Sequence, residues 1–97
     1  MNKTQKLSFI EGTFNDTEAK EILINVFTAK INFHQVKNFS SQERFGKVDN
    51  FAAKRIIELR KGLEEALELV KEAQEKQLHL QLSSEITITL TPGNQDS

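Results

Sequence analysis

The stretch Asp49–Leu90, DNFAAKRIIELRKGLEEALELVKEAQEKQLHLQLSSEITITL, decides the fold because its hydrophobic period changes once. In its first part, apolar residues recur at alternating spacings of four and three, which predicts a helix with one buried seam over about residues 50–77. From Leu78 the period becomes two, which predicts a strand over about residues 78–90. The seam consists of Ala52, Ile56, Leu59, Leu63, Ala66, Val70 and Ala73.

The residues before this stretch predict a second helix and a further strand. Asn15 and Glu18 have the spacing of a capping box, and the apolar residues that follow predict a helix over about residues 16–31. The short segment Lys6–Glu11, rich in Phe and Ile, predicts a strand. The expected fold class is therefore α+β, with two helices (about 16–31 and 50–77) packed on a small sheet that includes a long C-terminal strand (about 78–90). We expect a single domain over residues 1–97, with flexible ends at about 1–5 and 92–97.

Three segments admit alternative interpretations. Residues 33–37 are either a short strand or the end of the first helix, and we favour the strand. Residues 40–48 are expected to form a loop. Residues 78–90 are either one strand or a hairpin that turns at Ser83-Ser84-Glu85. Because that site has no Gly, Asn-Gly or Asp-Gly to supply a positive φ, we favour the continuous strand.

The lengths of the last helix and strand predict a homodimer. The helix spans about 42 Å at 1.5 Å per residue, and the strand spans about 43 Å at 3.3 Å per residue. A compact chain of 97 residues has a diameter of roughly 32 Å. The short strands predicted at 6–11 and 33–37 cannot pair the long strand along its whole length, and an unpaired half would form an edge prone to association. A second copy of the chain would cover it through a sheet or helix-face interface about a two-fold axis.

Composition excludes several classes of chemistry. The chain has no cysteine, so disulfides, thiolate catalysis and cysteine-based zinc sites are excluded. No segment has the order of a secretory signal, and no apolar run approaches the ~20 residues that span a membrane, so we expect a cytoplasmic protein without membrane association. The net charge is −1, but residues 30–61 carry eight Lys or Arg against three acids, whereas residues 63–97 carry two against seven.

Side chains suited to binding a ligand or partner gather in and just before the expected loop. Arg44 and Lys47 are suited to a phosphate or carboxylate, and Phe39 and Phe45 to forming the walls around it. His34 is the nearby imidazole. The predicted ligand- or partner-binding residues are therefore His34, Phe39, Arg44, Phe45 and Lys47; the alternative is a structural connection with its Phe side chains in the core. No phosphate-loop pattern or paired-histidine spacing is present, so we expect no nucleotide cradle, cofactor or metal.

Three functions are compatible with these features. The first is a small binding or interaction module that acts as a homodimer, without catalytic residues, and contacts its partner through Phe39–Lys47 and an exposed helix face. The second is a small-molecule or anion-binding, enzyme-like site around His34, Glu43 and Arg44. The third is a nucleic-acid accessory protein that uses the basic region 30–61, which the sequence pI of about 6.1 disfavours.

Overall fold

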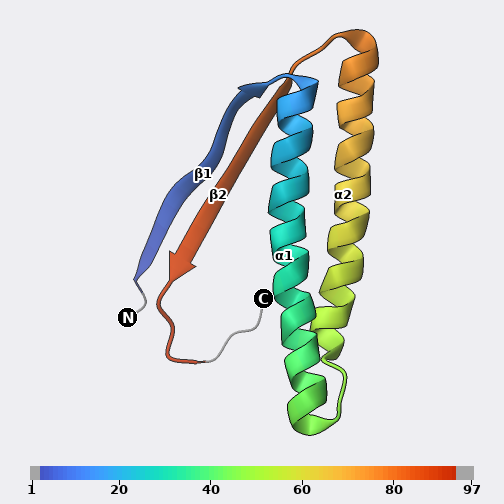
Figure 1. Ribbon diagram of the computed structural model, residues 1–97. Coiled ribbons are helices and arrows are strands. Elements are labelled where there is room, and N and C mark those ends of the chain that lie inside the picture. Colours follow the sequence, from blue (N-terminus) through green and yellow to red (C-terminus); the bar gives the residue numbers. More distant parts are fainter. Residues whose placement is uncertain (1–2, 94–97) are drawn as a thin grey trace.

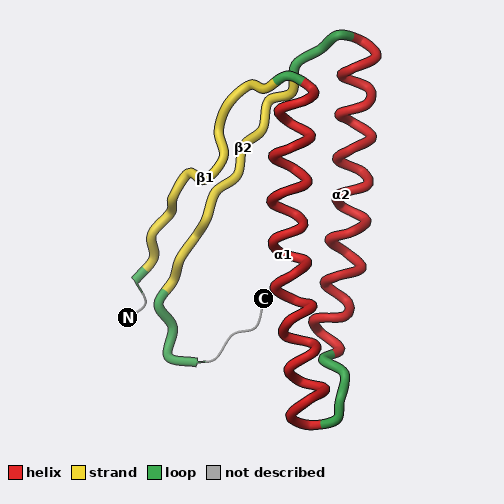
Figure 2. The backbone as a smooth tube through the Cα atoms, viewed as in Figure 1, coloured by secondary structure: helices red, strands yellow, loops and turns green. Residues whose placement is uncertain are grey.

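The computed structural model describes residues 3–93, which form β1 (Thr4–Phe14), α1 (Asp16–Phe45), α2 (Asn50–Lys76) and β2 (Leu80–Thr89). The helices form an antiparallel hairpin, and the two strands pair beside it as a two-stranded antiparallel sheet, here called the ribbon (Figure 1, Figure 2). The predicted α+β class is confirmed: two helices pack against a small sheet that includes the C-terminal strand.

Helix α1 begins where the capping box predicts and ends much later than Ile31. The Asn15 side chain accepts a hydrogen bond from the Glu18 N–H at 2.8 Å, and the Glu18 carboxylate accepts one from the Asn15 N–H at 3.1 Å. These two bonds satisfy amides that have no partner within the first turn. The helix ends after Phe45 because Gly46 adopts φ 63°, the left-handed conformation that glycine reaches without steric cost.

The strand favoured over residues 33–37 is wrong, because this segment lies inside α1. The loop expected over residues 40–48 is wrong up to Phe45, and residues 46–49 alone connect the helices. No Gly or Pro stands between Asp16 and Gly46, so the helix meets no residue that would stop it. The imperfect alternation of 33–37 comes from apolar side chains on several sides of one helix.

Helix α2 packs along α1 through the seam that its spacing predicts, and every seam residue is buried or half-buried. Asp49 caps its start by accepting a hydrogen bond from the Ala52 N–H at 3.0 Å, and Gln77 ends it at φ 56°. A Cβ atom added to Gly62 would lie 3.2 Å from Cε2 of Phe27. Glycine at this position therefore lets the Phe27 ring of α1 lie directly on α2.

The ribbon joins the two strands along their whole length, from Thr4 opposite Thr89 to Phe14 opposite Leu80. The continuous C-terminal strand is confirmed, and the hairpin alternative at the two serines is wrong. β1 is longer than the predicted strand at both ends, and it contains a β-bulge. The register shifts between Ser8 and Ile10, which leaves Phe9 without an opposite residue.

The full-length pairing corrects the premise of the predicted homodimer. Half of the long strand was expected to lack a neighbour within the chain, and β1 supplies that neighbour over residues 80–89. The strand therefore needs no second copy to pair the edge that faces β1. A dimer could form through the outer edges of the two strands, which have no neighbouring strand among the described residues, or through the faces of the ribbon and the helices.

The molecule is a thin slab, with extents of 50 × 36 × 14 Å and a radius of gyration of 16.7 Å. The ribbon lies beside α1 near the β1–α1 connection and diverges from it toward the other end (Figure 1). No residue of the ribbon between Thr4 and Thr89 is fully buried among the described residues, so the core is confined to the helical hairpin. Its buried residues are Ala19, Ile31, His34, Ala52, Ile56, Val70 and Ala73.

Candidate functional site

A groove of about 450 Å³ opens where the ribbon leaves α1. Its ribbon wall includes Ile10 and Leu82, and its helix wall consists of Leu23, Val26 and Phe27. These five side chains are apolar, and Ile10, Leu23, Phe27 and Leu82 are half-buried, while the polar Gln81, Ser83 and Ser84 also line the ribbon wall. The contact between ribbon and helix is therefore hydrophobic but incomplete.

Beyond the groove, the same face of the ribbon is uncovered. Leu7 lies opposite Ile86, and Ile88 and Leu90 continue on that face because alternate residues of a strand share a side. These four residues, here called the ribbon end, are between 41% and 64% exposed. The apolar face thus runs from a half-covered part beside α1 to an open part that no described element covers.

Helix α1 carries a matching apolar surface. Val26, Phe33 and Val36 are spaced by seven and three residues, so they lie along one side of the helix; they are here called the α1 stripe. Val26 lines the groove, while Phe33 is 50% and Val36 66% exposed. The ammonium groups of Lys30 and Lys37 lie 4.9 and 6.0 Å from the centroid of the Phe33 ring. These cation–π contacts place positive charge beside the exposed ring.

The residues predicted from sequence as a binding site do not form one surface. His34 is fully buried, whereas Arg44, Phe45 and Lys47 are exposed at the turn between the helices. His34 and Arg44 are ten residues apart in the same helix, a rise of about 15 Å. Phe39 is 59% exposed, so it is not plugged into the core. The turn residues lie close together, but His34 is not among them.

His34 is the largest fully buried side chain of the described residues. Its ring makes edge contacts with Phe33 at 5.2 Å and with Phe51 at 6.3 Å between centroids. Neither ring nitrogen has a hydrogen-bond partner among residues 3–93. Burial lowers the pKa of His34, and Lys30, Arg55 and Lys37 act in the same direction, against the opposing effect of Asp49. The imidazole therefore favours its neutral form, which suits a packing role inside the hairpin.

Charge is divided between the two ends of the hairpin. Residues 30–61, around the turn, hold eight Lys or Arg against three acids. The opposite half, residues 16–29 and 62–76, holds eight acids against three Lys. Because the helices run antiparallel, these two sets occupy opposite ends of the hairpin rather than mixing (Figure 1). The hairpin therefore has a basic end and an acidic end, and their net charges are equal in size and opposite in sign.

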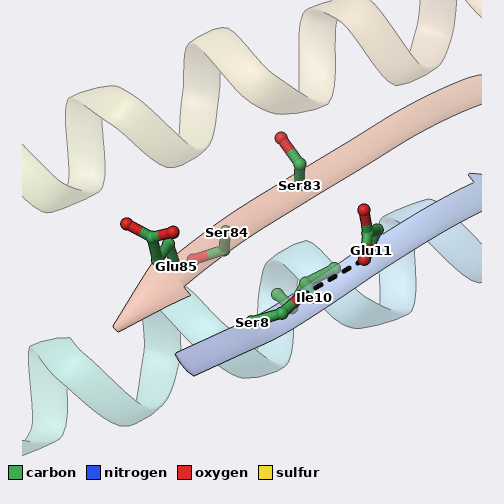
Figure 3. A pocket seen from close by; sticks show the side chains of 6 residues that line it. All are labelled: Ser8, Ile10, Glu11, Ser83, Ser84 and Glu85. Carbon is green, nitrogen blue, oxygen red and sulfur yellow. Dashed lines mark hydrogen bonds between the residues drawn. The ribbon is translucent and has the colours of Figure 1, made fainter. Parts of the chain in front are cut away.

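A hollow of about 330 Å³ lies at the β-bulge, lined by residues of both strands (Figure 3). The Ser8 hydroxyl donates a hydrogen bond to the Glu11 carboxylate at 3.4 Å, and Glu85 is opposite Ser8 in the strand register. Among residues 3–93, no group of three His, Asp or Glu side chains could hold a metal ion. The lining residues are Ser8, Ile10, Glu11, Ser83, Ser84 and Glu85.

The ribbon end and the α1 stripe are the surfaces that reasoning from sequence missed. The spacing of Val26, Phe33 and Val36 is the signal in the sequence that could have found the stripe, because it places them on one side of a helix. Neither described helix is apolar enough over a sufficient length to cross a bilayer. Comparison of the chain with known protein families, with curated proteins and with solved structures gave no match.

Proposed function

We propose that this chain is a non-catalytic interaction module that works as a homodimer. The observation that carries the proposal is the apolar surface that one copy leaves uncovered. The seven side chains of the ribbon end and the α1 stripe are each at least 36% exposed. Exposed apolar surfaces on a small folded chain often mark sites of association.

The total exposed area supports the same proposal. The chain exposes 7781 Å², whereas a compact monomer of 11.1 kDa exposes about 5,700 Å². The excess of roughly 2,000 Å² is larger than the ~800 Å² that each partner buries in an interface of standard size. The radius of gyration of 16.7 Å also exceeds the value of about 12.5 Å expected for a compact chain of this length. One copy is therefore more open than a compact chain of this size, which supports association with a second copy.

The measurement that tests the proposal is the molar mass in solution by light scattering after size exclusion, over a wide range of protein concentrations. We expect twice the chain mass of 11.1 kDa at micromolar concentrations. A molar mass equal to that of one chain at every concentration would contradict the proposal.

A matched pair of substitutions locates the interaction. Ile88 belongs to the ribbon end and Thr87 faces the other side of the sheet. Ile88→Thr keeps a β-branched side chain and removes apolar area, so we expect a loss of about 1 kcal/mol per copy, or roughly 30-fold in the dimer dissociation constant for two copies. Thr87→Ser should leave that constant unchanged. Equal effects of the two substitutions would show that the ribbon end is not in the interface.

A further inference from the structure

We propose that the two copies associate antiparallel, so that the ribbon end of each packs on the α1 stripe of the other. This inference rests on the proposed homodimer and adds its geometry. Three observations carry it: the matching positions of the two surfaces along the molecule, their shared apolar character, and the division of charge between the ends of the hairpin.

The ribbon end and the α1 stripe lie at similar distances from the β1–α1 connection. Leu7 is seven residues before Phe14, about 23 Å along the strand. Phe33 is 17 residues after Asp16, about 26 Å along the helix. Within one chain the ribbon diverges from α1, and the side chains of the two surfaces remain between 36% and 66% exposed. A second copy can bring them together.

A two-fold axis makes the two contacts equivalent. If the ribbon end of one copy covers the α1 stripe of its partner, symmetry requires the reverse contact as well. Both apolar surfaces of both copies are then buried in one interface. Because the two surfaces lie at nearly the same level, the axis passes near the middle of the hairpin, and the helices of the two copies overlap along most of their length.

Charge selects the direction of the second copy. An axis along the helices would place the basic end of one copy beside the basic end of the other, and like charges repel. An axis across the helices places the basic end, residues 30–61, beside the acidic end, residues 62–76 and 16–29. The equal and opposite excess at the two ends therefore favours the antiparallel arrangement.

Electron–electron dipolar spectroscopy on single spin labels tests the direction, and the cysteine-free chain allows each label to be placed alone. Lys47 is exposed at the turn, and Gln35 is exposed near the middle of α1. Because α1 has 30 residues and is about 45 Å long, we expect Lys47→Cys labels of the two copies to lie more than about 40 Å apart. Gln35→Cys labels should be closer than the Lys47 labels, since they flank the axis. The Gln35 variant is the control that reports the dimer itself.

The outcomes separate this inference from the proposed function. A short distance between Lys47 labels, below about 25 Å as for helices packed side by side in parallel, overturns the antiparallel geometry while the dimer stands. A Gln35 variant without any dipolar signal overturns both proposals.

A second measurement needs no substitution. In a mixture of unlabelled and ¹⁵N-labelled chains, zero-length carbodiimide cross-links of mixed isotope composition report contacts between copies. We expect them to join lysines of residues 30–61 to glutamates of residues 62–76. Mixed cross-links confined to lysines and glutamates of the same end would overturn the arrangement.

Discussion

Replacing His34 with Leu should stabilise the protein. The imidazole is fully buried between Phe33 and Phe51, and its two nitrogens have no hydrogen-bond partner among the described residues. A buried polar group without a partner costs about 1–3 kcal/mol. Leucine has a similar volume and no polar atom, so we expect His34→Leu to raise the free energy of unfolding by about 1 kcal/mol near neutral pH.

The same substitution should flatten the dependence of stability on pH. Desolvation, together with the nearby cations, lowers the pKa of His34 in the folded protein, while the unfolded chain has a value of about 6.5. As the pH falls below that value, the unfolded chain binds a proton that the folded chain does not bind. The free energy of unfolding of the wild type therefore falls as the pH falls from about 6.5 toward the folded-state pKa, by at most about 1.4 kcal/mol per pH unit.

Urea denaturation at fixed protein concentration, between about pH 5.5 and pH 7.5, measures both effects. The His34→Leu curve should lie above the wild-type curve, and the gap should widen toward acid. His79 is exposed between α2 and β2, so His79→Gln is a matched control that removes an imidazole outside the core. Parallel curves for the wild type and His34→Leu would refute the reasoning, because His34 would then not resist protonation in the fold.

Two further predictions concern the helical hairpin. Ile56 is 9% exposed and Ile57 is 68% exposed. In thermal or urea unfolding, Ile56→Ala should therefore lower the free energy of unfolding by about 2–5 kcal/mol, and Ile57→Ala by less than about 0.5 kcal/mol. Similar losses for the two variants would mean that the seam is misplaced. Asp49 accepts a hydrogen bond from the Ala52 N–H at 3.0 Å, so Asp49→Ala should cost about 1 kcal/mol, while Asn50→Ala, one residue later, should cost little. An Asp49→Ala variant as stable as the wild type would argue against this cap.

Each helix or strand could be predicted from the sequence as well as its apolar spacing was regular. That regularity depends on how many neighbouring elements its apolar side chains contact. Helix α2 faces α1 alone through most of its apolar side chains, so its spacing predicts both the element and its buried seam. Helix α1 has α2 on one side, the ribbon on another and uncovered apolar residues between them. Its apolar positions therefore spread around the helix, and a part of it resembled a strand. The predicted first strand is too short because it stops before Gly12, a residue type that often ends a strand, whereas β1 continues through Gly12 to Phe14.

The candidate site was harder to predict than the fold. Reasoning from sequence joined His34 to Arg44 and Lys47 because it placed a loop over residues 40–48. In a continuous helix, each residue adds about 1.5 Å along the axis. The ten-residue separation of His34 and Arg44 therefore keeps His34 well away from the turn. The ribbon end could not be recognised as an open surface from the alternation of β2, because alternation shows which residues share a face and not whether another element covers it.

The order of the elements has a consequence for the newly made chain. β1 precedes both helices and β2 follows them, so the ribbon pairs the two segments that are farthest apart in the described chain. The helices, in contrast, are joined by residues 46–49 alone, and this short connection turns α2 back along α1. During synthesis the first strand leaves the ribosome well before its pairing strand exists. The helical hairpin can form from local contacts, and closure of the ribbon comes last. A chain whose translation stops inside α2 would leave the Phe- and Ile-rich first strand without a partner and prone to aggregate.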